Sequence, residues 1–268
     1  MRGRVLIVAG SDSGGGAGIQ ADIKTVTMLS AYAATAITAL TVQNTEGVFG
    51  VLPVPPDFVR RQIEVVLDDI GADAIKTGML HDTAVIETVA AALLAERAGA
   101  VPLVVDPVMA AKGGARLIDP AAVDALKGLL IKRATVLTPN LPEAEILCGR
   151  PIGDVDAMRA AGRDLLGLGC RAVLVKGGHL AGDVVTDVLV TAAGSRMWQS
   201  PRIATRHTHG TGCTLASAIA AGLAQGLAIE DAIDRARLYV QRAIATAPGF
   251  GRGHGPLDHA HPLEAGSH

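Results

Sequence analysis

Aromatic side chains are scarce in this sequence and make up 2% of its 268 residues. Proteins that bind single-stranded nucleic acids stack the bases on such side chains, so the composition argues against that function. The 24 lysines and arginines nearly balance the 26 acidic residues, and no stretch gathers them into a basic block. Neither a nucleic acid nor a membrane surface is therefore indicated as a partner.

Cysteine is also rare, and the three residues are Cys148, Cys170 and Cys213. Their odd number and wide spacing predict neither a disulfide framework nor a zinc ribbon, and free thiols favour the cytoplasm. The apolar run within residues 1–10 is shorter than a signal peptide requires. The alanine-rich run over residues 213–229 contains Ser217 and Gln225, so it predicts a buried helix and not a membrane span.

Small apolar residues and glycine are abundant instead, with 49% of the chain apolar and 32 glycines. This composition suits a parallel sheet between close-packed helices. The apolar runs predict strands at residues 4–9, 35–42, 74–76, 102–106, 135–137 and 172–175, a hairpin at 184–190 and 196–203, and helices at 57–70, 120–130, 154–168, 211–227 and 230–246. The alternation predicts one α/β domain over residues 1–268, a three-layer α/β/α sandwich with a mostly parallel central sheet. A surface tail is expected from about residue 249.

Polar residues follow the predicted strands at the point where each strand ends. In an open α/β sheet, ligands bind beyond the carboxyl ends of the parallel strands. Ordinary loop residues would be spread over both edges of the sheet. The polar residues that would meet at the carboxyl edge are Ser11, Asp12, Gln43, Asn44, Lys76, Thr77, Asp106, Thr138, Asn140 and Lys176. Their positions predict a binding site at that edge.

A glycine-rich turn at residues 208–214 directly precedes the alanine-rich helix. Backbone N–H groups at Gly210 and Gly212 can converge there on one point, and the helix dipole adds positive potential, which predicts an anion hole for a phosphoryl group. Cys213 falls in the first turn, where a helix N-terminus lowers the pKa of a thiol, so it could accept a proton from a substrate hydroxyl. The simpler interpretations are a loop with a helix cap at Thr211 and an inert, buried cysteine.

Phosphoryl transfer from ATP needs Mg²⁺ and cations that neutralise the phosphates. Asp106, at the end of a predicted strand, and Glu143 are candidates for organising Mg²⁺ through waters. Lys176 could reach the triphosphate as a point charge. Taken singly, each residue is equally explained as a surface charge or a helix cap, and Glu143 suits the first turn of a helix. Their joint position at one edge favours the functional interpretation.

A second glycine-rich loop, at residues 10–18, follows the first predicted strand. Its glycine spacing does not match a dinucleotide-binding fingerprint, because the last glycine falls one residue early. Glycine lets a backbone approach a flat ligand closely, and Asp22, Gln43 and Asn44 offer hydrogen bonds to a heteroaromatic ring. The alternative for Gln43 is a polar residue that merely ends a strand.

The ordered segments together resemble one known family. Residues 9–22, AGSDSGGGAGIQAD, resemble the opening of the hydroxymethylpyrimidine/phosphomethylpyrimidine kinases of the ribokinase-like superfamily. Similar segments follow in the family's order at residues 41–45, 76–79, 105–109, 137–145, 175–179 and 209–214. The resemblance implies a ribokinase-like fold and two successive ATP-dependent phosphorylations in thiamine diphosphate biosynthesis. The substrates would be 4-amino-5-hydroxymethyl-2-methylpyrimidine and then its monophosphate.

The same resemblance implies roles for individual residues and a homodimer. Gln43 would bind the aminopyrimidine, with Gly10, Asp22, Met79 and Val108 around it. ATP and Mg²⁺ would be served by Asp106, Thr138, Asn140, Glu143, Lys176 and Thr211, with the metal at Asp106 and Glu143. Cys213 would be the base, beside the anion hole of Gly210 and Gly212 and the charge of Lys176.

Two other functions share parts of this pattern. A pyridoxal or pyridoxine kinase would share the fold, the ATP apparatus and the cysteine, although the Gln43–Asn44 pair favours the pyrimidine. A non-catalytic sensor would bind the pyrimidine in a retained pocket. The intact glycine turn, together with Glu143 and Lys176, argues against the sensor.

Overall fold

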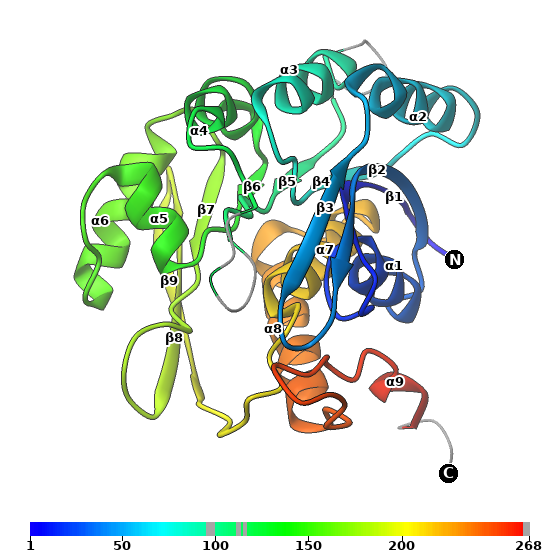
Figure 1. Cartoon of the computed structure of the whole chain (residues 1–268). Coiled ribbons are helices and arrows are strands. Elements are labelled where there is room, and N and C mark those ends of the chain that lie inside the picture. Colours follow the sequence, from blue (N-terminus) through cyan, green and yellow to red (C-terminus); the bar gives the residue numbers. More distant parts are fainter. Residues whose placement is uncertain (95–99, 111–113, 115–116, 265–268) are drawn as a thin grey trace.

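A computed structural model of the chain describes residues 1–94, 100–110, 114 and 117–264. Within these residues, nine strands form one sheet in the order β3-β2-β1-β4-β5-β6-β7-β8-β9 (Figure 1). The six adjacent strands β2, β1, β4, β5, β6 and β7 pair in parallel, whereas β3, β8 and β9 run antiparallel to their neighbours. The strands are β1 (Arg4–Asp12), β2 (Tyr32–Gln43), β3 (Val48–Pro53), β4 (Ala74–Thr77), β5 (Leu103–Val105), β6 (Val136–Leu137), β7 (Ala172–Val175), β8 (Val184–Thr191) and β9 (Gly194–Pro201). The predicted mostly parallel sheet is confirmed.

Helices cover both faces of the sheet (Figure 1). Side chains alternate along a strand, so Val5 and Ile7 of β1 pack toward one helical layer while Leu6 and Val8 pack toward the other. The first layer holds α1 (Gly18–Met28), α7 (Thr211–Ala224) and α8 (Ile229–Ala245). The second layer holds α2 (Pro56–Asp69), α3 (Thr83–Ala92), α4 (Ala122–Ala125), α5 (Leu141–Cys148) and α6 (Val155–Leu166). This is the predicted three-layer arrangement.

Several helix ends follow from local sequence chemistry. The side chain of Asp82 accepts a hydrogen bond from the backbone N–H of Val85 and begins α3. Other parts differ from the prediction. The helix expected at residues 120–130 is regular only over α4 and continues as a π-helical turn, Leu126–Leu130. The edge strand β3 and the short helix α9 (His261–Glu264) were not predicted.

The predicted surface tail is wrong for part of its length. Leu257 and His259 are buried, and the phenolic hydroxyl of Tyr239 donates to the carbonyl of His259 at 2.7 Å. Glycine allows this close packing, since a Cβ on Gly253 would lie only 2.0 Å from the carbonyl oxygen of Thr45. Residues 265–268 of the predicted tail lie outside the described residues. In the described ranges no helix has the length and apolarity to cross a membrane.

Candidate active site

Two cavities open at the carboxyl edge of the parallel strands. The first, of about 490 Å³, lies beyond β1 and β4 and is called the β1 cavity. The second, of about 510 Å³, lies between β8, β9 and α8 and is called the β9 cavity. Both cavities are lined by Asn140, Lys176, His179, Thr208, Thr211 and Gly212. These six residues form the junction, where ligands in the two cavities would meet.

Most residues predicted from the sequence lie in the wall of the β1 cavity. They come from strand ends and helix starts far apart in the chain, because the carboxyl ends of parallel strands share one edge. The predicted residues that line this cavity are Gly10, Ser11, Asp12, Gln43, Lys76, Met79, Asp106, Val108, Asn140, Glu143, Lys176, Gly210, Thr211, Gly212 and Cys213. Asn44 lies outside its lining, although the sequence placed it at the same edge.

An ion pair marks the junction of the two cavities. The ammonium of Lys176, just after β7, lies 3.0 Å from a carboxylate oxygen of Asp106, just after β5. Burial lowers the pKa of Lys176, but the carboxylates of Asp106 and Glu143 outweigh that effect and hold the pKa above its usual value. The hydroxyl of Thr138 donates to Asp106 at 3.1 Å. Thr138 lines neither cavity, so its contact with Asp106 is what connects it to the site.

The glycine turn lies directly against this ion pair. Gly210 has a φ of 83°, and a Cβ there would lie 1.8 Å from the carbonyl oxygen of Gly16. A Cβ on Gly212 would lie 3.2 Å from the ammonium of Lys176. The first N–H groups of a helix lack intrahelical acceptors, and in α7 they belong to residues at this junction. The predicted meeting of the turn with Asp106 and Lys176 is confirmed.

The prediction that Cys213 has a lowered pKa is wrong. Burial raises the pKa of this thiol to about 12, although the ammonium of Lys76 opposes the rise. A backbone N–H of Gly18, the first residue of α1, also donates to the sulfur. Loss of solvation therefore outweighs the helix N-terminus and the nearby cation. Cys213 nevertheless lies in the wall of the β1 cavity, where the base was expected.

Glu143 lies in the first turn of a helix and also lines the β1 cavity. Its carboxylate accepts from the backbone N–H of Asn140 at 2.8 Å, and the side chain of Asn140 accepts from the backbone N–H of Glu143 at 2.9 Å. This capping box begins α5. Burial raises the pKa of Glu143 to about 7, against the opposing charge of Lys176.

The residues present fit a magnesium ion that is held mainly by its substrate. The described part of the chain contains no cluster of three or more His, Cys, Asp or Glu side chains able to hold a metal. Mg²⁺ commonly uses one or two carboxylates together with waters and substrate phosphates. Asp106 and Glu143 both line the β1 cavity and supply such carboxylates.

The predicted contact between Asp22 and the substrate requires correction. Asp22 is fully buried and lies outside the cavity wall. Its two carboxylate oxygens lie 3.0 and 2.8 Å from the ammonium of Lys76, and Ser217 donates to it at 2.7 Å. Burial raises the pKa of Asp22 and Lys76 opposes this, while the two short contacts fit an ionised pair. Lys76 was expected at this edge of the sheet, but no pattern in the sequence indicated Asp22 as its partner.

Two further residues of the β1 cavity were missed as a pair. The imidazole Nε2 of His209 lies 2.8 Å from the carboxylate of Asp12 and 3.3 Å from the side-chain nitrogen of Gln43. Burial raises the pKa of Asp12, but His209 and the backbone N–H groups of the glycine loop outweigh it and lower the pKa. The histidine within the turn at residues 208–214 was the available signal.

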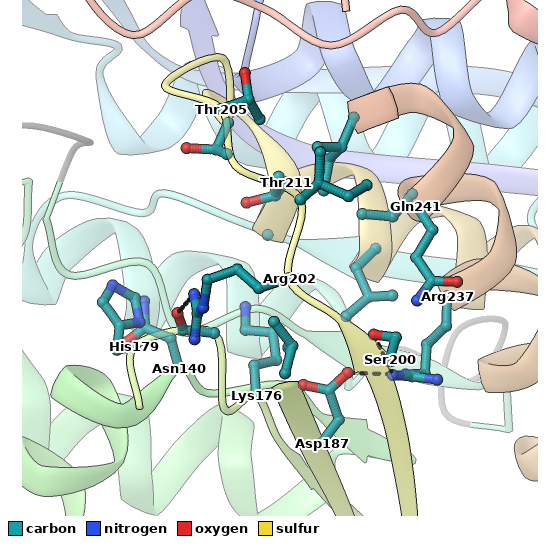
Figure 2. Close-up of a pocket in the computed structure, with 18 of the residues that line it drawn as sticks. Asn140, Lys176, His179, Asp187, Ser200, Arg202, Thr205, Thr211, Arg237 and Gln241 are labelled. Carbon is teal, nitrogen blue, oxygen red and sulfur yellow. Dashed lines mark hydrogen bonds and ion pairs between the residues drawn. The ribbon is translucent and has the colours of Figure 1, made fainter. Parts of the chain in front are cut away.

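Beyond the junction, the β9 cavity is lined by side chains that were assigned no role from the sequence, among them Asp187, Arg202 and Arg237. Figure 2 shows Arg237 and Gln241 of α8 on one side, with Lys176, Asn140 and His179 on the other. Arg237 donates to the carboxylate of Asp187 at 2.8 Å (Figure 2). Asp187 also accepts from the backbone N–H of Gly177 at 3.0 Å. The pair therefore ties α8 to β8 and to the residue after Lys176.

Comparisons with known proteins agree with this geometry. The family model described as phosphomethylpyrimidine kinase matches residues 12–258. The thiamine biosynthesis bifunctional protein ThiED of Geobacter sulfurreducens is 56% identical over 96% of this chain, which spans only 52% of that longer protein. The hydroxymethylpyrimidine/phosphomethylpyrimidine kinase of Bacillus subtilis is 46% identical over 96% of this chain and 94% of its own length.

A solved structure supports the same fold. The pyridoxal kinase of Bacillus subtilis, crystallised as an ADP complex, superposes with a TM-score of 0.90 at 36% identity, covering 98% of this chain and 99% of that one. The predicted ribokinase-like fold is confirmed by this likeness and by the sheet described above. From the family match over residues 12–258 and the identity to its curated members, the chain belongs to the phosphomethylpyrimidine kinase family of phosphotransferases.

Proposed function

We propose that this protein transfers the γ-phosphoryl group of ATP to 4-amino-5-hydroxymethyl-2-methylpyrimidine, and then phosphorylates the monophosphate to the diphosphate used in thiamine diphosphate biosynthesis. One observation carries the proposal. The two cavities share a wall at Lys176, Thr211 and Gly212, so an acceptor in one and a nucleotide in the other meet at the glycine turn. Such a site performs phosphoryl transfer by positioning its ligands and neutralising charge.

The pyrimidine is assigned to the β1 cavity. Gln43 lies in its wall and can offer both a donor and an acceptor to an aminopyrimidine edge. Gly10 and Met79 face each other closely, since a Cβ on Gly10 would lie 3.2 Å from the terminal methyl of Met79. Val108 lines the same cavity, so that a flat ring would lie between apolar surfaces.

The nucleotide is assigned to the β9 cavity, with its phosphates toward the junction. Lys176 and the N–H groups around Thr211 and Gly212 would bind the phosphates. Mg²⁺ would be held by Asp106 and Glu143 through waters, and it would neutralise phosphate charge during transfer. The hydroxyl proton of the substrate is assigned to Cys213.

The finer properties of the protein belong to the same proposal. We infer that residues 1–268 form one kinase domain, and that the protein is a cytoplasmic homodimer. Three free cysteines support the reducing compartment. The exposed side chains of Val42, Phe49 and Leu52 on the β2–β3 hairpin support a partner copy there. Sedimentation of the wild type and of Phe49→Lys tests the dimer, which the substitution should dissociate.

A pyridoxal kinase is the second candidate, because the pyridoxal kinase of Bacillus subtilis has so similar a fold. It is the less favoured candidate. That enzyme is 36% identical to this chain, whereas the curated pyrimidine kinase of the same organism is 46% identical.

The experiment is an ADP-release assay with the hydroxymethylpyrimidine, ATP and Mg²⁺, with pyridoxal as a competitor. Product analysis should show the monophosphate first and the diphosphate after it. A clear preference for pyridoxal would instead identify the protein as a pyridoxal kinase. Tight pyrimidine binding by calorimetry without ADP release would instead support a non-catalytic sensor.

A further inference from the structure

A fully buried ammonium borders the β1 cavity. No part of Lys76 is exposed, yet the residue belongs to the cavity wall together with Cys213. Asp22 of α1 holds the ammonium through both carboxylate oxygens, and Ser217 of α7 donates to one of these oxygens. The three residues therefore join β4, α1 and α7 beneath the glycine turn.

Stability alone gives a poor account of this ion pair. Removing two charges from water costs about as much as their attraction returns, and apolar replacements of buried pairs are often neutral or stabilising. The pair is fully buried in a fold whose two helical layers pack on the sheet mainly through apolar side chains. Charged groups kept in such surroundings are concentrated at functional sites.

Helix geometry places the pair next to Cys213. Residues four apart on an α-helix lie on the same face, one turn from each other, so Cys213 and Ser217 of α7 face the same side. Ser217 contacts Asp22, and Asp22 contacts Lys76. Gly78 leaves space for the ammonium, because a Cβ there would lie 2.9 Å from it.

The charged groups that act on the Cys213 sulfur come from several elements. Lys76 of β4 favours the thiolate, and Lys176 after β7 is a second cation that interacts with this sulfur. Asp22 of α1 and Asp106 after β5 act against the thiolate, while the N–H of Gly18 at the start of α1 favours it. Without Lys76, Lys176 alone would oppose the two carboxylates and the burial that disfavour the thiolate.

We propose that Lys76, fixed by Asp22 and Ser217, is a positioning residue whose ammonium is the counter-charge of the Cys213 thiolate. The inference deepens the proposed function and rests on it. In the transfer step, which proceeds from the thiolate form of Cys213, the substrate O–H bond breaks and its proton forms the S–H bond. The substrate oxygen then bonds to the γ-phosphorus, and the bridging P–O bond breaks with its electron pair leaving on ADP.

The test measures Cys213 directly, without turnover. The full-length protein is treated with iodoacetamide at one mildly alkaline pH, and alkylation of Cys213 is followed by peptide mass spectrometry. The double variant Lys76→Met with Asp22→Asn removes both charges together, so neither is left buried alone. We expect its alkylation rate to fall about threefold, because the charge of Lys76 outweighs the opposing charge of Asp22 at this sulfur and one pKa unit changes the thiolate fraction about tenfold. An unchanged rate would overturn the proposal.

Two controls separate this effect from damage to the fold. Arg150→Met with Asp164→Asn removes a solvent-exposed ion pair outside the two cavities, and should leave Cys213 alkylation unchanged. Buried Cys170 reports on opening of the core, and it should stay unreactive in every variant. If the double variant exposes Cys170, Ser217→Ala decides instead, because it loosens Asp22 without removing a charge. It should slow alkylation about threefold, and no change would overturn the proposal.

Turnover measurements distinguish this inference from the proposed function. The double variant should lower kcat and move the rise of kcat with pH, which reports deprotonation of the base, to higher pH, with the KM for ATP unchanged. If Cys213→Ala turns over as the wild type does, the thiol is not the base, and the proposed mechanism fails whatever the alkylation shows. If Cys213→Ala is inactive but the double variant alkylates normally, only the role of Lys76 is lost.

Discussion

The two cavities at the edge of the sheet are built in different ways. The β1 cavity lies beyond parallel strands and is lined by glycines, by apolar side chains such as Met79 and by charged groups such as Asp106. The β9 cavity lies between an antiparallel hairpin and α8, and long side chains such as Arg202 and Arg237 form its wall (Figure 2). The first is fixed by the topology of the sheet, and the second by side-chain packing between elements.

Lys176 lines both cavities, so its replacement should have the largest effect on catalysis. The loss should appear whichever substrate is varied. For Lys176→Met we expect kcat to fall about 10³-fold, because the migrating phosphoryl group loses a fixed charge. Steady-state kinetics with both substrates measures this. Lys132→Met, which removes an exposed lysine outside both cavities, should keep wild-type kinetics. A loss confined to the KM of one substrate would place Lys176 in one cavity only.

The glycine turn is the next most sensitive part of the junction. Gly210→Ala should lower kcat about 100-fold, since a Cβ would collide with the carbonyl of Gly16 and displace the turn from Lys176. Gly226→Ala is the matched control. Gly226 has a φ of 84° but open space around it, so alanine there should cost about 1 kcal/mol of stability without changing kinetics. If both variants lost the same amount of kcat, backbone strain alone would explain the effect of Gly210→Ala.

A substitution of Gln43 should affect binding of the pyrimidine without affecting binding of ATP. Gln43→Ala is expected to raise the KM for the pyrimidine about tenfold, because a polar ring atom loses its partner in a desolvated site. The KM for ATP should not change, because Gln43 lines only the β1 cavity. Calorimetric titration with each ligand checks both statements, and an equal effect on ATP would show that the cavities are coupled.

The same comparison explains what the sequence could predict. Strand runs and the residues that follow them predicted the sheet and most of the β1 cavity, because parallel strand ends converge by topology alone. Asp187 and Arg237 gave no such signal, since the registers of β8 and α8 bring them together only in three dimensions. The burial of Asp22 and the raised pKa of Cys213 were missed for a related reason. Both depend on desolvation by neighbours distant in sequence.

Loss of the Arg237–Asp187 pair should have a smaller effect, and it should weaken binding of ATP instead of the pyrimidine. Replacing both residues, Arg237→Met with Asp187→Asn, is expected to raise the KM for ATP about fivefold by loosening α8 against β8. The pyrimidine KM should stay at its wild-type value. Competition with ADP in a binding assay measures the change, and a variant that weakens only the pyrimidine would reverse the assignment of the two cavities.

The buried tail should affect the stability of the fold. At neutral pH it should leave the kinetic constants for both substrates unchanged. Burial lowers the pKa of His259 from 6.5 to about 4, and its ring lies 3.0 Å from the hydroxyl of Thr214 in α7. Between these pH values the unfolded chain binds more protons than the folded one, so the free energy of unfolding falls as the pH falls from 6.5 toward 4.

The loss attributable to His259 is at most about 3 kcal/mol. Urea unfolding of His259→Gln across this pH range should show a shallower slope than the wild type, since glutamine can keep the contact with Thr214 without titrating. His254→Gln replaces an exposed histidine and should keep the wild-type slope. If His259→Gln also keeps it, the acid sensitivity arises in the carboxylates of the β1 cavity, and the tail supports α7 by packing alone.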